Sequence, residues 1–244
     1  LEGGQDDGML PRVDAVIFDE AHKLPEIATN YFGSELSTTA IREVVESMRP
    51  ILMGKFKSAA PKGTSWDVIT QTIKKSLYDF VLGLEGAGVL EGDSRNIETI
   101  SGMQGSTQHL ENAALVLEVL LEAAAPFVEM SDDLGVFIES GTAILQDMKQ
   151  WVIWLKHAGM PMPPEQKPLV RWISRSRSEA RLTVTPLDIA EPFSRMMSLR
   201  KETAWVFTSA TMAVGDGEFK HFTQALGIEG AEEHAWNSPF DHEN

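Results

Sequence analysis

The sequence lacks cysteine and long apolar runs, and both absences exclude classes of protein. Without cysteine among its 244 residues, the chain has no disulfide framework, thiolate metal site or cysteine nucleophile. No apolar run reaches the eighteen or more residues that a membrane span needs, and no signal peptide opens the chain. These features predict a cytoplasmic protein with no membrane partner.

Positive charge is also scarce. The chain has 21 basic and 36 acidic residues, for a formal net charge of −15. A surface coated with nucleic acid needs clustered Lys and Arg, so any DNA contact must be local. One basic segment, residues 167–201, carries eight basic and three acidic side chains. The candidate DNA-binding residues in it are Arg171, Trp172, Arg175, Arg177 and Arg181. Trp172 is the candidate for base stacking; the alternative is a solvated face that pairs with acidic neighbours.

The pattern of hydrophobic residues predicts an α/β chain interrupted by helices. Residues 13–18 form a β-branched apolar run that is typical of a buried parallel strand. Helical spacing follows from about residue 37, with Ser37 or Thr38 as the candidate N-cap. Further helices are expected over 65–84, 110–125 and 131–157. Residues 86–105 are interpreted as a long loop or linker. Strand-like segments return at 169–174, 181–185 and 204–208, with helical stretches near 188–199 and 217–226.

This order predicts a helical domain inserted into a sheet domain. The expected boundaries are 1–35 for the first part of the sheet domain, 36–164 for the insertion and 165–244 for the return. The chain begins at Leu1 and ends soon after a turn-like Ser238-Pro239-Phe240, and both ends are interpreted as cuts through a longer protein.

Two adjacent carboxylates follow the first predicted strand, in the string Asp19-Glu20-Ala21-His22. Ligands of open α/β sheets bind at the carboxyl ends of strands. At such a place Asp19 would hold Mg²⁺, and Glu20 would position and deprotonate the water that attacks the γ-phosphate of ATP. His22 would sense the phosphate and contact the coupling residues of the second polar string. The alternative is a surface acidic cluster that caps the following helix.

A second polar string, Thr208-Ser209-Ala210-Thr211, directly follows the apolar run 204–207. Small hydroxyl residues at the end of a strand can link a nucleotide-side histidine to a DNA-side surface through hydrogen bonds that rearrange with phosphate state. Ser209 and Thr211 are the candidate coupling residues. Alone the string is a weak signal, because Ser and Thr often cap the next helix.

The pair of strings resembles motifs II (a DEAH box) and III of superfamily 2 helicases. The 185 residues between His22 and Thr208 are similar in size and place to the Arch insertion of the XPD-like iron–sulfur helicases. The later stretches 182–188, 207–212 and 238–240 resemble the DinG/YoaA-type bacterial members of that family. The resemblance implies a partial RecA-like (P-loop NTPase) motor domain with an inserted, mostly helical Arch domain.

The resemblance further implies an ATP-dependent 5′→3′ DNA helicase that acts in repair or replication on single-stranded or forked DNA. The chain departs from the family pattern because it has no Gly-x-x-x-x-Gly-Lys-[Ser/Thr] phosphate loop and no cluster cysteines. A 4Fe–4S cluster would therefore lie outside it, and the chain alone is expected not to hydrolyse ATP.

Two rival interpretations remain. In the first, the helical insertion is a module that binds DNA or a repair or replication protein. In the second, the motor is the scaffold of a DinG-type nuclease without ATPase activity. An incomplete sheet is also expected to expose an edge or an apolar face, through which the chain would self-associate.

Overall fold

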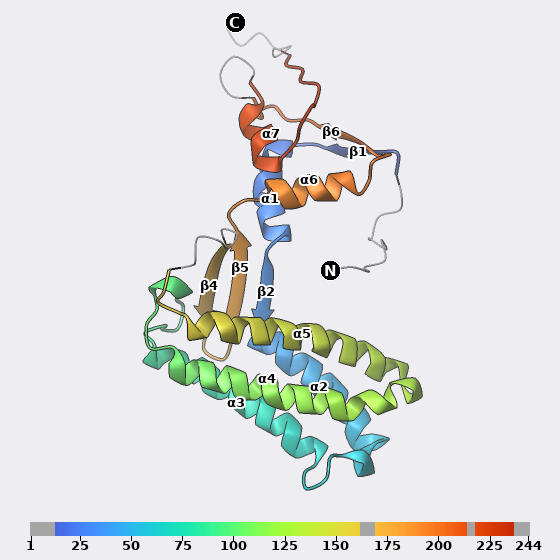
Figure 1. Cartoon of the computed structure of the whole chain (residues 1–244), viewed down its shortest axis with the longest axis vertical. Helices are drawn as coiled ribbons and strands as arrows, with labels where there is room; N and C mark the ends of the chain where they lie inside the picture. The colour runs from blue at the N-terminus through green and yellow to red at the C-terminus, as the bar shows by residue number, and fades with distance from the viewer. Residues whose placement is uncertain (1–12, 162–168, 214–217, 237–244) are drawn as a thin grey trace, which may run out of the picture. The chain divides into compact units, whose positions relative to one another are not determined.

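The computed structural model describes residues 13–161, 169–213 and 218–236. The chain divides into two compact units. Figure 1 colours the chain from blue at the N-terminus to red at the C-terminus. The first, here the discontinuous unit, comprises Leu1–Gly33 and Pro186–Asn244. The second, here the inserted unit, comprises Ser34–Thr185. Within the described residues, no helix combines the length and the apolar character that crossing a membrane requires.

Long helices build the core of the inserted unit. They are α2 (Thr38–Gly54), α3 (Trp66–Gly86), α4 (Gln104–Ala124) and α5 (Asp132–Lys156), with short 3-10 turns at η2 (Lys57–Ala59), η3 (Ile97–Thr99) and η4 (Ala125–Met130). Serine hydroxyls fix two starts: Ser37 Oγ accepts from Ala40 N at 3.0 Å, and Ser65 Oγ accepts from Val68 N at 3.2 Å. Apolar residues at helical spacing, such as Met48 on α2, then face a shared core.

A small sheet completes the inserted unit. In the described part of the chain its strands lie in the order β2 (Ser34–Ser37), β5 (Ala180–Pro186), β4 (Leu169–Arg175) and β3 (Ser94–Asn96). Strands β2 and β5 are antiparallel with Leu36 opposite Leu182, and β3 and β4 are antiparallel with Asn96 opposite Trp172. Side chains alternate along each strand, so Ile173 and Leu182 are buried while Trp172 is exposed.

One domain boundary differs from the expected one because of how this sheet pairs. Residues 165–185 were assigned to the returning sheet domain, but β4 and β5 pair with β3 and β2 inside the inserted unit, whose limit is Thr185. The interpretation of 86–105 as a long loop or linker is confirmed in part: most of 87–103 lies outside helices, with only β3 and η3 within it, but the segment is packed and is not a linker. Val89, Ile97, Ile100 and Met103 are each at most 2% exposed and belong to the same hydrophobic core as the long helices.

The discontinuous unit joins the two ends of the chain. Its elements are β1 (Ala15–Phe18), η1 (Ala21–Lys23), α1 (Leu24–Tyr31), α6 (Ala190–Ser198), β6 (Ala204–Phe207) and α7 (Lys220–Leu226). Strands β1 and β6 pair in parallel, with Phe18 opposite Phe207. Leu24, Phe193 and Leu226 are among the buried residues of its core.

One face of the β1–β6 pair is apolar and exposed. Ile17 is 67% exposed and Val206 is 42% exposed, whereas Phe18 and Phe207 on the other face stack on each other and contact the core. The expectation that the sheet would expose an apolar face is confirmed. Self-association through that face stays a prediction.

Candidate functional site

The two polar strings of the sequence lie side by side in the discontinuous unit. Each begins where a strand ends, and β1 and β6 are parallel and in register, so both strings start at the same edge of the sheet. Backbone hydrogen bonds join them directly: Thr208 N donates to Phe18 O at 2.8 Å, and Ala21 N donates to Thr208 O at 2.9 Å. Residues 187 positions apart in sequence therefore form one local structure.

Asp19 is held on one side and open on the other. Its Oδ1 atom accepts hydrogen bonds from Thr208 Oγ1 and from Glu20 N, each at 3.0 Å. Its Oδ2 atom accepts no hydrogen bond from any described residue, and the side chain is exposed. One carboxylate oxygen is thus oriented by the protein while the other is available to a ligand.

Glu20 has an unusual backbone. With φ 52° and ψ 39° it is in the left-handed region, and it is the one non-glycine residue with positive φ among those the structure describes. A glutamate in this region costs about 1 kcal/mol or more, which the surrounding hydrogen bonds must offset. Such strain concentrates at functional sites. The side chain is 61% exposed, and its Oε2 lies 3.2 Å from His22 Nδ1.

His22 connects Glu20 to the second string. Its Nδ1 atom is 2.9 Å from Ser209 Oγ as well as 3.2 Å from Glu20 Oε2. Ser209 Oγ also accepts from Thr211 N at 3.1 Å. A series of polar contacts therefore connects the Glu20 carboxylate, the His22 imidazole, the Ser209 hydroxyl and the Thr211 backbone. Thr211 takes part through its backbone N–H, whereas its hydroxyl was the expected contributor.

The donor set fits a magnesium–nucleotide site of the kind the sequence predicts. Magnesium in nucleotide sites keeps several waters and takes one or two protein carboxylates plus substrate phosphates. Asp19, at a strand end and with one carboxylate oxygen that accepts no hydrogen bond from the described residues, is the residue that would serve as such a ligand. No cluster of three or more His, Asp or Glu side chains that could hold a metal ion by itself exists among residues 13–161, 169–213 and 218–236.

The five candidate DNA-binding residues lie in the inserted unit, and they separate into two groups. Arg171 and Arg175 are only 6% and 8% exposed. The Nη2 atom of Arg171 is 3.0 Å from Glu98 Oε1, and its guanidinium lies 5.6 Å from the centre of the Trp154 ring. Arg175 donates to Val89 O at 3.0 Å and to Glu85 Oε2 at 3.1 Å. Both arginines therefore tie the sheet to the helical core.

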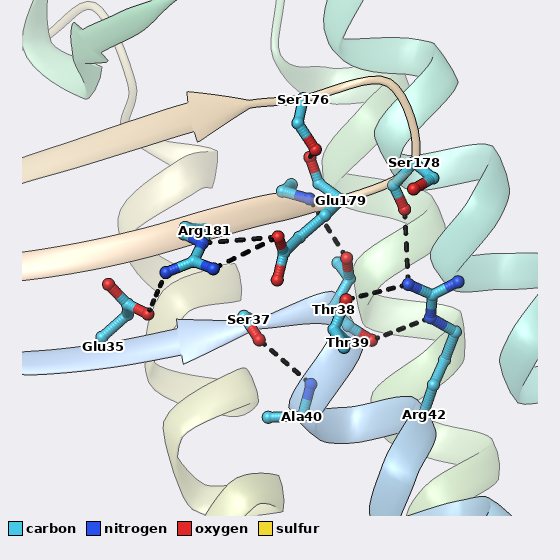
Figure 2. Close-up of polar contacts among 11 residues, drawn as sticks. Glu35, Ser37, Thr38, Thr39, Ala40, Arg42, Ser176, Ser178, Glu179 and Arg181 are labelled. Carbon is cyan, nitrogen blue, oxygen red and sulfur yellow. Dashed lines mark hydrogen bonds and ion pairs between the residues drawn. The ribbon is translucent and has the colours of Figure 1, made fainter. Parts of the chain in front are cut away.

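Trp172, Arg177 and Arg181 are exposed. Trp172, 38% exposed, borders a shallow hollow on the outer face of the sheet together with Ser94, Ser174 and Thr183. Arg177 lies in the turn between β4 and β5. Figure 2 shows Arg181 between the carboxylates of Glu35 and Glu179. The nearest nitrogen–oxygen distances are 3.2 Å to Glu35 and 3.4 Å to Glu179, so two carboxylates offset its charge.

Sequence reasoning did not single out Thr208. It is the first residue of the second string, for which the sequence predicts coupling through Ser209 and Thr211. Its hydroxyl nevertheless provides the side-chain hydrogen bond to Asp19. Two parallel strands in register bring the residues after their last positions together, so pairing β1 with β6 would have revealed this contact.

Two curated proteins are similar to this chain over most of its length. No protein-family model matches the chain. Over 234 residues, or 96% of its length, the chain is 30% identical to the ATP-dependent DNA helicase YoaA of Haemophilus influenzae. It shows the same identity over the same length to the ATP-dependent DNA helicase YoaA of Escherichia coli. The aligned region is 34% of each of these proteins, so the chain spans about a third of the length of these curated relatives.

Proposed function

We propose that this chain, which belongs to the DinG/YoaA-type helicase family, supplies the magnesium- and water-handling part of an ATP-dependent DNA helicase. The observation that carries the proposal is the convergence of the two polar strings at one edge of a parallel sheet. In this proposal the discontinuous unit is part of a RecA-like motor domain, and the inserted unit is its Arch-like insertion. The phosphate loop, and any 4Fe–4S cluster, would be supplied by sequence outside these residues.

The geometry supports a distinct task for each carboxylate. Asp19, with Oδ1 oriented by two donors, would hold the Mg²⁺ that accompanies ATP. Glu20, exposed and within reach of a histidine, would position and deprotonate the attacking water. When bound, Mg²⁺ offsets the charge that develops on the phosphate oxygens. Phosphoryl transfer is otherwise catalysed by positioning. The backbone bonds between the two strings would hold Asp19 and Glu20 in place for that task.

His22 would couple this chemistry to DNA. Its Nδ1 is shared by Glu20 and Ser209, at 3.2 and 2.9 Å. Any movement of the Glu20 side chain during hydrolysis therefore changes the balance between these two partners. Ser209 passes the change to the backbone of Thr211. The proposed outcome is 5′→3′ movement along DNA in a cytoplasmic repair or replication process.

The proposed DNA contact in the inserted unit rests on Trp172 and Arg177. Trp172 offers an exposed ring, and stacking on an aromatic ring tolerates any base. Arg177 is exposed and has no ion-pair partner among the described residues. Arg181 lies on the same segment but is already paired with two carboxylates, and the buried Arg171 and Arg175 are not included in this surface.

Glu20→Gln in the full-length protein tests the proposal. The substitution keeps the size of the side chain and removes its basic carboxylate, so DNA-stimulated ATP hydrolysis should fall by about a hundredfold or more. Glu26→Gln is the matched control, because Glu26 is exposed on α1 of the same unit and should leave the rate unchanged. An inactive wild type would sink the motor proposal and favour a nuclease scaffold or a binding module instead.

A further inference from the structure

Thr208 is joined by backbone and side-chain hydrogen bonds to the first string and to the last residue of β1. Its N–H donates to Phe18 O at 2.8 Å, and its carbonyl accepts from Ala21 N at 2.9 Å. Its hydroxyl donates to Asp19 Oδ1 at 3.0 Å, with Phe18 O farther away at 3.4 Å. A hydroxyl has one hydrogen, and the shorter contact to a charged oxygen is the stronger one. The hydroxyl therefore serves the carboxylate.

The backbone bonds alone would hold the strands together without that hydroxyl. They fix the position of Thr208 against β1, and this leaves its side chain a narrow range of orientations beside Asp19. A hydrogen bond to one carboxylate oxygen selects a rotamer of the acid and leaves the second oxygen for a metal. Asp19 Oδ1 already accepts from Glu20 N, so the Thr208 hydroxyl adds the contact that comes from the other strand.

We propose that Thr208 is a positioning residue, which orients the Asp19 carboxylate for the magnesium that accompanies the nucleotide. The inference rests on the proposed function, because it assigns Thr208 to the same site. It also adds a second connection between the strings. Ser209 follows Thr208 directly, so a shift of this strand end reaches the metal-binding carboxylate as well as His22.

The test is Mn²⁺ binding to the full-length protein in the presence of a non-hydrolysable ATP analogue, followed by electron paramagnetic resonance. Mn²⁺ stands in for Mg²⁺, and binding is read without turnover. Thr208→Val removes the hydroxyl and keeps the shape, and it should weaken Mn²⁺ binding about tenfold. Thr208→Ser restores the donor and should bind within about twofold of the wild type. The Mg²⁺ concentration for half-maximal ATPase activity should rise in parallel in the valine variant.

A matched control lies at the opposite end of the same strand pair. The Thr203 hydroxyl donates to Val13 O at 3.1 Å, so it joins the two strands but does not contact Asp19. Thr203→Val should leave Mn²⁺ binding unchanged. Thermal melting establishes that each variant is folded; if the valine variant is not, Thr208→Ala takes its place.

The outcomes separate the two proposals. Wild-type affinity in Thr208→Val, or equal losses in the Thr203 and Thr208 valine variants, would overturn the positioning role while leaving the motor intact. A loss in Thr208→Ser as large as in Thr208→Val would overturn it too, because the methyl group would then be responsible. A wild type that binds no Mn²⁺ with the analogue would overturn both proposals.

Discussion

Replacing Arg171 by alanine should destabilise the inserted unit without acting on DNA directly. Arg171 is 6% exposed, and its side chain makes two contacts that alanine cannot make. One is the ion-paired hydrogen bond to Glu98 at 3.0 Å, and the other is the approach of the guanidinium to the Trp154 ring at 5.6 Å. A hydrogen bond to a charged group is worth about 1.5–3 kcal/mol and a partly buried cation–π contact about 1 kcal/mol.

Two features reduce the expected loss. The Glu98 side chain is 28% exposed, so water can solvate its carboxylate once the arginine is gone. The Nε atom of Arg171 is buried without a hydrogen-bond partner among the described residues, so the wild-type pair is already imperfect. The expected loss in the free energy of unfolding is therefore about 2–3 kcal/mol. With a urea dependence of about 2 kcal/mol per molar, the unfolding midpoint should fall by about 1 M.

Urea unfolding followed by tryptophan fluorescence measures this loss. Trp66, Trp151 and Trp154 lie in the inserted unit, so the signal reports mainly on that unit. Arg177→Ala is the control, because the side chain is exposed in the turn after β4 and its loss should change stability by at most about 0.5 kcal/mol. Equal stability of the Arg171 variant and the wild type would refute the structural role of the buried arginine.

Two further predictions concern the inserted unit. Thr38→Val should lower the free energy of unfolding by about 1–3 kcal/mol, measured by chemical denaturation. Thr38 is 2% exposed and its hydroxyl accepts a hydrogen bond from Ala180 N at 3.1 Å (Figure 2), so valine would leave that buried N–H without a partner. An unchanged unfolding midpoint would contradict this. Trp172→Ala should weaken binding of single-stranded DNA by about five- to 150-fold in a fluorescence-anisotropy titration, since stacking is worth about 1–3 kcal/mol per base. Trp236→Ala, which removes a tryptophan that is 85% exposed in the other unit, is its control, and similar losses in both variants would argue against a specific platform.

The features that the sequence predicted well depend on neighbours along the chain. Ser37, one of the two candidate N-caps, caps α2, because capping is decided by residues three positions apart. The strands that precede the two polar strings were also recognised, at 15–18 and 204–207, from short β-branched or aromatic runs. These signals depend on neighbouring residues only, so they do not change with how the rest of the chain folds.

The features that the sequence missed depend on long-range pairing. Nothing near β4 shows that it pairs with β3, about 80 residues earlier, and this pairing moved the boundary of the inserted unit. The burial of Arg171 and Arg175 could have been predicted from their positions along β4. Both share strand parity with Ile173, so all three side chains point to the same buried face, whereas Trp172 points away.

The proposed coupling requires that the two polar strings act as one unit through His22 and Ser209. A double-mutant cycle on DNA-stimulated ATP hydrolysis by the full-length protein tests it most directly, using His22→Ala, Ser209→Ala and the double variant. Because the two side chains meet at 2.9 Å, the serine change should cost little once the histidine is gone, with a coupling free energy of at least about 1 kcal/mol. Additive losses would contradict the account, since they would mean that the two strings contribute independently.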